Sequence, residues 1–499
     1  MNTDAMTLEA ALASSRRFLP ELVLTAALLL VVVIDSTRAR WRDGVNFLLA
    51  AAALLASLGL CLQLDVTSGE IWGGMVVLDP IVRFFKVLLI AASFLVLVMF
   101  RRSRELAGLV MSEMYALLLA VTLSNLLLAA SNDLAMLYLA LEMVSITSYV
   151  MVSYMKGDRL SNEAGLKYIL FGAVSTGVML YGLSLMYGLT GTTSLPGIQE
   201  HLASGISDGS RWALYVITLL IFAGFGFKTA AAPFHFWCPD VYQGAPTPVT
   251  AFLSVAPKAA GFAVMMRFFY SGLATEAAQW DIMPTINWQP MLIIVSVLTM
   301  TIGNIAALTQ TNMKRLLAYS SIAHAGYMLM GVVAASQFGA RGMMVYLLAY
   351  VFMNLGAFLV VTLIHYHDGT FDLRDYPGLY RRAPLLTIAM AVFLLSLMGI
   401  PPLVGFMGKL YVFAAVVQSG HYWFAVVGAV NAAIAAYYYA RVMKTMVIDA
   451  GNEDKPPVVL PALEYAWIVV LVAANVLPLL FWGSIDGWTL ASLTSVAGR

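Results

Sequence analysis

The chain has 499 residues, of which 61% are hydrophobic and 11% are charged, and its net charge is +1 with the histidines neutral. Soluble domains carry roughly 25% charged residues, so this composition indicates a protein that crosses the membrane many times. The near-zero net charge gives no bulk electrostatic argument for binding nucleic acid, and two cysteines in unrelated segments, Cys61 and Cys238, exclude a disulfide framework or a cysteine cluster.

A membrane span needs about 20 apolar residues, and fourteen segments meet this criterion. In chain order they cover 18–34, 45–64, 80–100, 111–130, 132–154, 164–188, 212–237, 246–270, 290–309, 315–336, 343–366, 385–418, 421–447 and 462–482. The loops between them are short. We therefore expect an all-α polytopic membrane protein with fourteen transmembrane helices and no soluble domain.

The start of the chain shows no cleaved signal, because Arg16 and Arg17 lead directly into the first span without a clear cleavage site. Near the outer end of the third span, Asp79, Arg83 and Lys86 are expected to snorkel or to form local pairs.

Lysines and arginines in the loops set the expected orientation, because cytoplasmic loops carry an excess of them. If the loop with Arg42 is cytoplasmic and the spans alternate, 15 loop cations fall on the cytoplasmic side and 5 on the other. The cytoplasmic set is Arg38, Arg40, Arg42, Arg101, Arg102, Arg104, Lys156, Arg159, Lys314, Arg315, Arg374, Arg381, Arg382, Lys444 and Lys455, and the opposite set is Arg16, Arg17, Arg211, Arg341 and Arg499. We therefore expect both termini to lie away from the cytoplasm.

Four ionisable residues lie well inside predicted spans: Glu142, Lys228, Lys258 and Lys409. Each costs roughly 2.5–3.5 kcal/mol at the bilayer centre, so such residues face the bundle interior. A structural ion pair between Glu142 and one lysine is the simplest explanation, but three lysines and one carboxylate leave two lysines without a partner. A buried amine without a counter-ion loses its proton more readily than in water, which suits a proton carrier.

Two histidines lie near these charges. His324 lies mid-span among Ser320, Ser321 and Tyr327, and either a relay role or simple packing accounts for it. His235, in PFHFW, is a weaker candidate.

Two spans also contain prolines beside a lysine. Pro233 lies five residues after Lys228, and Pro401 and Pro402 lie just before Lys409. A proline frees the carbonyl four residues back, and exposed backbone at membrane depth survives only in a protein-lined or wet cavity. The breaks therefore predict water near each lysine, although a kink alone needs no lysine.

The two breaks share the pattern G-F-x-x-K, in GFGFK at 224–228 and GFMGK at 405–409. A second, looser match pairs the segment starting at Leu166 with the one starting at Met313. The seventh and twelfth spans run in opposite directions in the expected topology, and paired broken helices in inverted halves are typical of transporters.

The stretch GFGFKTAAAPFHFWCPDVYQGAPTPVTAFLSVAPKAAGF resembles the core of the antiporter-like subunits of respiratory complex I and of multisubunit cation/proton antiporters. The resemblance covers spans four to thirteen. GIPPLVGFMGKLYVF, with Lys409, is similar to the branch of the complex I subunits that carries lysine rather than glutamate in the twelfth span.

This resemblance implies two inverted five-helix repeats, spans 4–8 and 9–13, with discontinuous helices 7 and 12. The corresponding segments are 1–105, 111–270 for the first repeat, 288–448 for the second repeat, and 449–499. By the family pattern, Glu142 and Lys228 form the charged pair of the first half-channel, Lys258 is the central carrier, and protons leave from Lys409. His324 falls where a polar residue links the two halves.

The resemblance further implies a proton-translocating subunit of NADH:quinone oxidoreductase. We expect it in a bacterial inner membrane, where the loop charges above place both termini in the periplasm. With no intact GxGxxG or GxxxxGK[ST] motif, we expect no cofactor in this chain, whereas NADH, FMN, Fe–S clusters and quinone belong to partner subunits. The expected partners are other membrane subunits of the complex (M, K and J as neighbours) and lipid, with quinone contacted only indirectly.

Three other functions remain open at this stage. One is a subunit of an independent cation/proton antiporter, the second is a structural membrane subunit with inert buried pairs, and the third is a photosynthetic relative of complex I.

Overall fold

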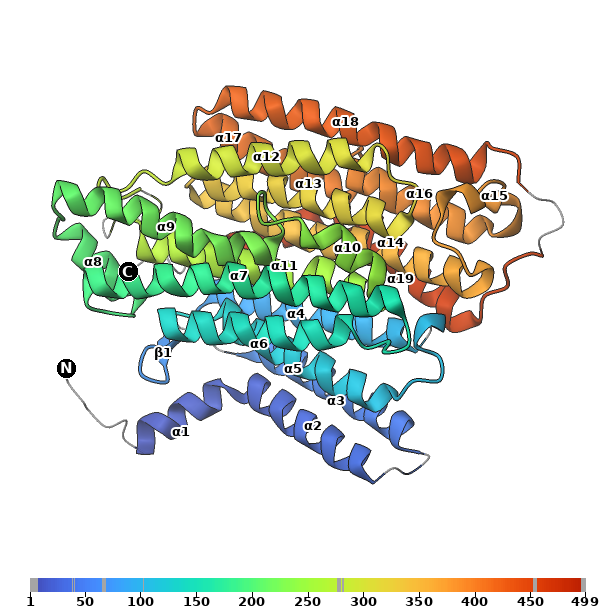
Figure 1. The fold of residues 1–499 in the computed structure, drawn as a ribbon, viewed down its shortest axis with the longest axis horizontal. Coiled ribbons are helices and arrows are strands. Elements are labelled where there is room, and N and C mark those ends of the chain that lie inside the picture. The colour runs from blue at the N-terminus through green and yellow to red at the C-terminus, as the bar shows by residue number, and fades with distance from the viewer. Residues whose placement is uncertain are drawn as a thin grey trace.

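The computed structural model describes residues 8–37, 39, 41–64, 69–101, 103–275, 280, 282–451 and 456–494. Its helices lie side by side in one elongated bundle, with their axes mostly along the same direction (Figure 1). Among the counted loop cations, Arg38, Arg40, Arg102, Lys455 and Arg499 lie outside the described residues.

The N-terminal segment contains three long apolar helices and a small hairpin. It consists of α1 (Leu8–Arg17), α2 (Leu19–Ser36), α3 (Arg42–Gln63), the antiparallel strands β1 (Gly69–Ile71) and β2 (Val76–Leu78), α4 (Pro80–Phe100) and the 3₁₀ turn η1 (Arg104–Leu106). Neither α1 nor the hairpin was expected from the sequence.

The next helices correspond to the predicted spans four to eight. They are α5 (Met111–Ala129), α6 (Leu134–Val152), α7 (Arg159–Thr190), α8 (Leu195–Ala203), α9 (Asp208–Thr229), α10 (Trp237–Gly244) and α11 (Thr247–Arg267), which continues into the π-helical turn η2 (Phe268–Gly272). The seventh predicted span is therefore divided, since α9 ends before Pro233 and α10 begins after it.

The remaining helices correspond to the predicted spans nine to fourteen. They are α12 (Gln289–Ala307), α13 (Met313–Val333), α14 (Gln337–Asp368), η3 (Leu373–Asp375), α15 (Leu379–Arg382), α16 (Pro384–Met398), α17 (Val404–Gln418), α18 (Tyr422–Val447), α19 (Ala462–Val476), η4 (Leu477–Leu479) and α20 (Trp482–Thr494). The sequence did not predict α20.

Within the described residues, 13 helices are long and apolar enough to cross a membrane. The helices α16 and α17 are shorter, and together they fill the twelfth predicted span. Each predicted span thus overlaps at least one helix, and the count of fourteen crossings stays a prediction. The division of the chain into two inverted repeats and two flanking segments stays a prediction.

Polar side chains at the helix starts explain several of these boundaries. Asp79, Asp133, Asp158, Asn312 and Ser336 each accept a hydrogen bond from a backbone N–H in the first turn of α4, α6, α7, α13 and α14. The first N–H groups of a helix have no partner within the helix, so these caps satisfy donors that would otherwise need water.

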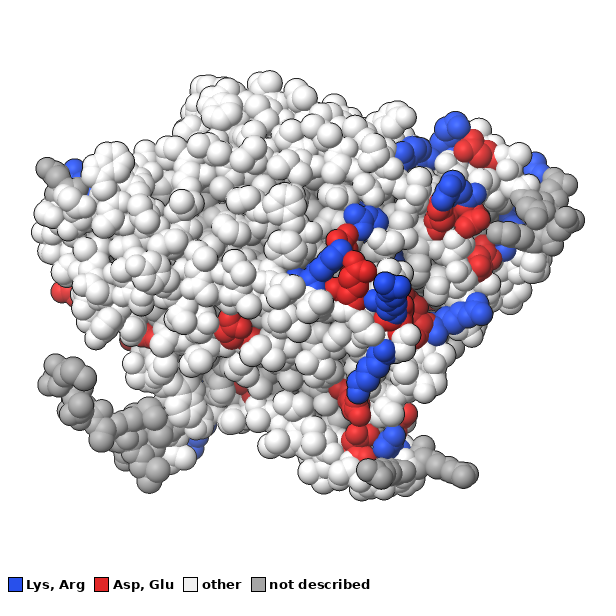
Figure 2. All heavy atoms as spheres, in the orientation of Figure 1, with Lys and Arg blue, Asp and Glu red and all other residues white. Residues whose placement is uncertain are grey.

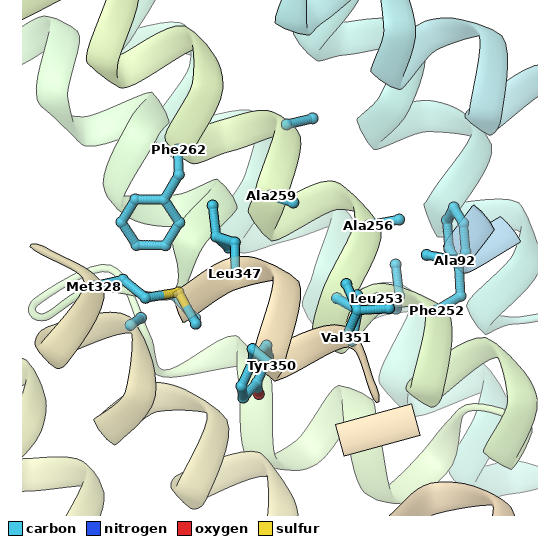
Figure 3. Packing of buried hydrophobic residues seen from close by; sticks show 14 of the residues in the cluster. Ala92, Phe252, Leu253, Ala256, Ala259, Phe262, Met328, Leu347, Tyr350 and Val351 are labelled. Atoms are coloured by element: carbon cyan, nitrogen blue, oxygen red, sulfur yellow. The ribbon is translucent and has the colours of Figure 1, made fainter. Parts of the chain in front are cut away.

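The core of the bundle is formed by α11, α13 and α14. All residues of α11 are buried, and α13 and α14 are buried over most of their lengths, whereas α2 and α19 are mostly exposed. Phe262 of α11 lies near Leu347 of α14, and Leu253 of α11 lies beside Val351 of α14 (Figure 3). Because α11 and α13 are enclosed by other helices, any charged group on them is removed from lipid.

Charged side chains gather at one end of the bundle, to the right in Figure 2, near α15 and the start of α7. We call this the basic end; among its residues are Lys156, Arg374, Arg381 and Lys444. Helix α8 and the β1–β2 hairpin lie at the opposite end (Figure 1).

Candidate functional site

The break between α9 and α10 is built from backbone that its neighbours satisfy. Ala230 adopts a left-handed conformation, with φ of 57°, and the Ala232–Pro233 peptide bond is cis. Ala232 N donates to Thr299 Oγ1 of α12 at 2.9 Å, and the Trp237 indole donates to Phe227 O at 3.1 Å. Two of the backbone groups at this break therefore have protein partners.

Lys228 lies in the last turn of α9 and is 2% exposed. Its Nζ donates to Ser145 Oγ of α6 at 3.3 Å. Glu142 lies one turn before Ser145 and is half-buried, but among the described ion pairs none within 4.0 Å joins it to Lys228. Lys228 therefore contacts the helix that carries Glu142 one turn away from that residue, and the pairing itself stays a prediction.

Lys228 also packs against the helix that carries Lys258. A Cβ placed on Gly261 of α11 would lie 3.4 Å from Lys228 Cγ, and Gly261 is one turn from Lys258. The absence of a side chain at residue 261 therefore lets the two lysine-bearing helices approach closely.

Lys258 lies in the middle of α11 and is 1% exposed. Its Nζ donates to Ser321 Oγ at 2.6 Å and to Ser321 O at 3.1 Å, both on α13. In the described ion pairs Lys258 has no carboxylate partner, so its ammonium group would be held by these neutral oxygens.

His324 lies one turn beyond Ser320 on α13, within a chain of hydrogen bonds. Its Nδ1 pairs with the Tyr346 hydroxyl at 2.8 Å and its Nε2 with the Tyr439 hydroxyl at 3.1 Å. Tyr439 in turn pairs with Ser320 Oγ at 2.5 Å. This chain joins α13, α14 and α18.

Lys409 lies in α17 after the second break and is 6% exposed. Its Nζ donates to Leu397 O at 3.0 Å and Met398 O at 2.8 Å, which are the last carbonyls of α16, and it lies 5.0 Å from the centre of the Tyr327 ring. The C-terminal end of a helix carries partial negative charge, so this position favours a cation.

The second break has its own geometry. Gly399 has φ of 87°, the Pro401–Pro402 bond is cis, and Gly405 N donates to Ser396 Oγ at 3.2 Å. Lys228 precedes its break, whereas Lys409 follows its break. The two lysines therefore stand on opposite sides of their breaks, as the order of lysine and proline in the sequence indicated, and the pairing of the two repeats stays a prediction.

Several polar residues near His324 and Lys409 were not identified from the sequence. Asn304 Nδ2 donates to the Tyr327 hydroxyl at 3.0 Å and to Asn431 Oδ1 at 3.3 Å, and Tyr438 donates to Asn304 Oδ1 at 3.2 Å. A sequence signal existed in α13, where residues 320, 321, 324 and 327 recur at the spacing of one helix face. Asn304 lies on α12 and Tyr439 on α18, and neither was singled out from the sequence.

Among the described residues, three buried ion pairs do not involve Lys228, Lys258 or Lys409. Lys86 pairs with Glu21 of α2 at 2.5 Å, Arg267 pairs with Asp79 at 2.7 Å, and Lys314 pairs with Glu105 at 3.3 Å. Pairing was expected for Asp79 and Lys86, but their partners are distant in sequence rather than local.

The sequence reasoning counted Lys314 as a loop cation and overlooked Glu21. In the structure Lys314 is fully buried at the start of α13, and Glu21 is fully buried in α2. Each is tolerated because its partner lies on another helix, which the sequence alone does not reveal.

Glu105 lies outside the spans, in the turn before α5. Burial by itself would raise the pKa of its carboxyl, but the Lys314 ammonium and the hydrogen bonds with Thr247 hold that pKa below its ordinary value. Glu105 is therefore an anion at neutral pH.

In the part of the chain that the structure describes, no three His, Cys, Asp or Glu side chains are grouped so as to hold a metal ion. His235 is buried and stacks on Phe236 with ring centroids 4.4 Å apart, away from the hydrogen bonds of His324. That this chain holds no cofactor stays a prediction.

Residues 131–435 match the family model described as NADH:quinone oxidoreductase/Mrp antiporter, transmembrane. The chain is 43% identical to NADH-quinone oxidoreductase subunit N of Anaeromyxobacter sp. (strain Fw109-5), with 98% of each chain covered. It is 44% identical to NAD(P)H-quinone oxidoreductase subunit 2 of Synechococcus sp. (strain JA-3-3Ab), over 91% of this chain and 86% of the relative.

Solved structures give the same picture. A chain of respiratory complex I from Thermus thermophilus superposes with a TM-score of 0.78 and 31% identity, over 94% of this chain and 98% of the other. A chain of the Mrp complex from Dietzia sp. DQ12-45-1b superposes with a TM-score of 0.82 at 19% identity, over 99% and 98%, which indicates a shared fold.

Proposed function

Because the chain belongs to the family of NADH-quinone oxidoreductase subunit N, an antiporter-like membrane subunit of respiratory complex I, we propose that Lys228, Lys258 and Lys409 carry protons along its core. The chain is a proton-translocating membrane subunit of this enzyme. In the proposal, the proton passes from Lys228 to Lys258 and is released from Lys409.

The observation that carries the proposal is the hydrogen-bonded chain Ser320–Tyr439–His324–Tyr346, which begins beside the partner of Lys258 and ends at Tyr346, against which Gly408, the residue before Lys409, packs. Lys258 donates to Ser321, and the adjacent Ser320 begins the chain through Tyr439 and His324 to Tyr346. Hydroxyl and imidazole groups both donate and accept, so such a chain can pass a proton by reorienting its members.

In the first half, Glu142 is proposed to hold Lys228 in its charged form, and Ser145, which accepts a hydrogen bond from Lys228, lies one turn from Glu142 on α6. When that influence weakens, the Lys228 proton passes to Lys258 through water and polar side chains between α9 and α11, which approach each other closely at Gly261. The positive charge that arrives at Lys258 then favours release of the proton from Lys409, since like charges repel strongly in a medium of low dielectric constant.

This chain does no redox chemistry in the proposal. NADH, FMN, Fe–S clusters and quinone are held by partner subunits, and electron transfer there supplies the driving force. Subunits M, K and J are the proposed neighbours.

The membrane is the bacterial inner membrane, and both termini face the periplasm. The gathering of Lys and Arg at the basic end supports this orientation, because cytoplasmic loops carry the excess of positive charge.

The test is Lys258→Met in the intact complex reconstituted in vesicles. We expect NADH oxidation to be slowed and the ratio of protons pumped to NADH oxidised to fall, because the amine at the centre of the line is missing. Undiminished pumping with normal assembly would reject the carrier role.

A subunit of an independent cation/proton antiporter is the second candidate, and the similarity of the fold to the Mrp complex chain favours it. Purification separates the two functions. NADH:quinone oxidoreductase activity that travels with the chain supports the complex I role, whereas cation-dependent proton exchange without that activity supports the antiporter.

A further inference from the structure

The helix that carries Lys258 is weak at the residue before it. Pro257 lies inside α11 and has no N–H to give to the carbonyl of residue 253. The contact between Lys258 and Ser321 joins α11 to α13, so it depends on how α11 is placed along and about its own axis. The contacts at the two ends of α11 therefore affect the distance between Lys258 and Ser321.

Helix α4 runs along α11. Ala92 of α4 lies beside Phe252 of α11 within the buried cluster (Figure 3). The N-terminal segment contributes one carboxylate just before α4, Asp79, and one just after it, Glu105. These two residues are thus placed to reach opposite ends of α11.

At the basic end, Glu105 joins three parts of the chain. Its Oε2 accepts from the backbone N–H of Thr247, the first residue of α11, at 2.7 Å. Its Oε1 lies 3.3 Å from Lys314 Nζ of α13, and Lys314 also donates to Ala245 O at 2.6 Å, just before α11. One carboxylate therefore ties the start of α11 to the start of α13.

At the opposite end, Asp79 joins α4 to α11. Its Oδ2 accepts from Arg267 Nη2, at the last residue of α11, at 2.7 Å. Its Oδ1 accepts from Val82 N at 2.8 Å and so caps α4. Both side chains of this ion pair are buried.

We propose that Asp79 and Glu105 are positioning residues that hold α11 at its two ends, and so keep Lys258 in contact with Ser321. A helix fixed at both ends cannot slide or rotate, even where a proline weakens its middle. The N-terminal segment, which lies outside the predicted repeats, thus acts on the central lysine without touching it. The inference rests on the proposed function only for its effect on pumping.

The test uses two variants that remove charge and keep an acceptor atom. Glu105→Gln still offers an oxygen to Thr247 N but no charge to Lys314, and Asp79→Asn still caps α4 but no longer pairs with Arg267. The matched control is Glu21→Gln, a buried carboxylate of the same segment whose partner, Lys86, lies on α4 rather than on α11.

Each variant is studied in the intact complex by two measurements. Cryo-electron microscopy gives the separation of Lys258 Nζ and Ser321 Oγ, and vesicles with a pH-sensitive dye give protons pumped per NADH oxidised across a range of pH. We expect both test variants to lengthen the separation, to lower the pumping ratio and to alter its pH dependence, whereas Glu21→Gln changes neither measurement in the complex that assembles.

An unchanged Lys258–Ser321 separation in both test variants overturns the proposal, and so does a control that alters the pH dependence as strongly as they do. If α11 moves and pumping stays normal, the positioning role stands and the carrier role of Lys258 fails. If a neutral variant does not assemble, Glu105→Asp, which keeps the charge on a shorter side chain, is judged by the same two measurements.

Discussion

The two broken helices both carry their lysine on the half that lies toward α8, but the order of lysine and break along the chain is opposite in the two. The lysine-bearing halves, α9 and α17, lie toward the end with α8, and the lysine-free halves, α10 and α16, lie toward the basic end (Figure 1). The chain enters the first break from Lys228 and leaves the second break toward Lys409.

Both lysines nevertheless meet the C-terminal end of a helix. Lys228 lies in the last turn of its own helix, α9, whereas Lys409 reaches the last carbonyls of the preceding helix, α16. The negative end of a helix dipole favours a cation in both cases. What the two regions share is thus an electrostatic environment rather than a position in the chain.

The regions differ in how firmly the amine is held. Lys409 makes two hydrogen bonds to backbone carbonyls at 2.8 and 3.0 Å, and Lys228 makes one to a hydroxyl at 3.3 Å. The second break should therefore depend on its lysine for structure, and the first break should depend on it much less.

The largest expected difference comes from the first glycine of each G-F-x-x-K pattern. A Cβ at residue 405 would lie 1.9 Å from Ser396 O, whereas a Cβ at residue 224 would lie 2.1 Å from Met179 Sδ. A backbone carbonyl cannot move aside but a methionine side chain can, so Gly405→Ala should cost about 3 kcal/mol or more and Gly224→Ala less. Native gels of membranes measure the assembled complex; equal amounts from the two variants would contradict this.

The variants Lys228→Met and Lys409→Met test how far the structure of each break depends on its lysine. Both variants should lose pumping, but Lys409→Met should also lower the thermal stability of the complex, because two buried carbonyls lose their partner at about 1–3 kcal/mol each. The measurement is the temperature of half-maximal aggregation of the purified complex. A larger loss for Lys228→Met would reverse the proposed difference.

Ser145→Ala removes the contact of Lys228 that the structure describes and should have a smaller effect. A single long hydrogen bond contributes about 1 kcal/mol or less, so we expect reduced pumping with normal assembly. Ser145→Thr keeps the hydroxyl and serves as the control. A parental pumping ratio for the alanine variant would show that Ser145 does not connect Glu142 to Lys228.

The smallest effect is expected for the stability that the Glu105 carboxylate contributes, which is present at neutral pH and is lost in acid. Because the folded protein holds the pKa of Glu105 below its ordinary 4.5, its contribution to stability is complete above about pH 4.5 and is lost as the pH falls through the lower folded value. Thermal stability of the parent complex relative to Glu105→Gln should therefore shrink below this pH. A constant difference down to pH 3 would contradict it.

The spans and the intramembrane charges were accessible from the sequence because both are local properties. A run of apolar residues long enough to cross the bilayer predicts a helix, and a lysine within such a run is conspicuous whatever surrounds it. Pro233, Pro401 and Pro402 marked the two breaks for the same reason, since proline excludes a continuous helix by its own geometry.

Which groups the buried charges contact was decided only by the tertiary structure. Nothing local links Lys258 to Ser321, Lys409 to the end of α16, or Glu105 to Thr247, because these contacts join segments from 11 to 142 residues apart. The sequence therefore determined which charges lie in the membrane. The packing of helices distant in the chain determined what each charge meets, because hydrogen bonds and ion pairs depend on distances that a linear pattern does not contain.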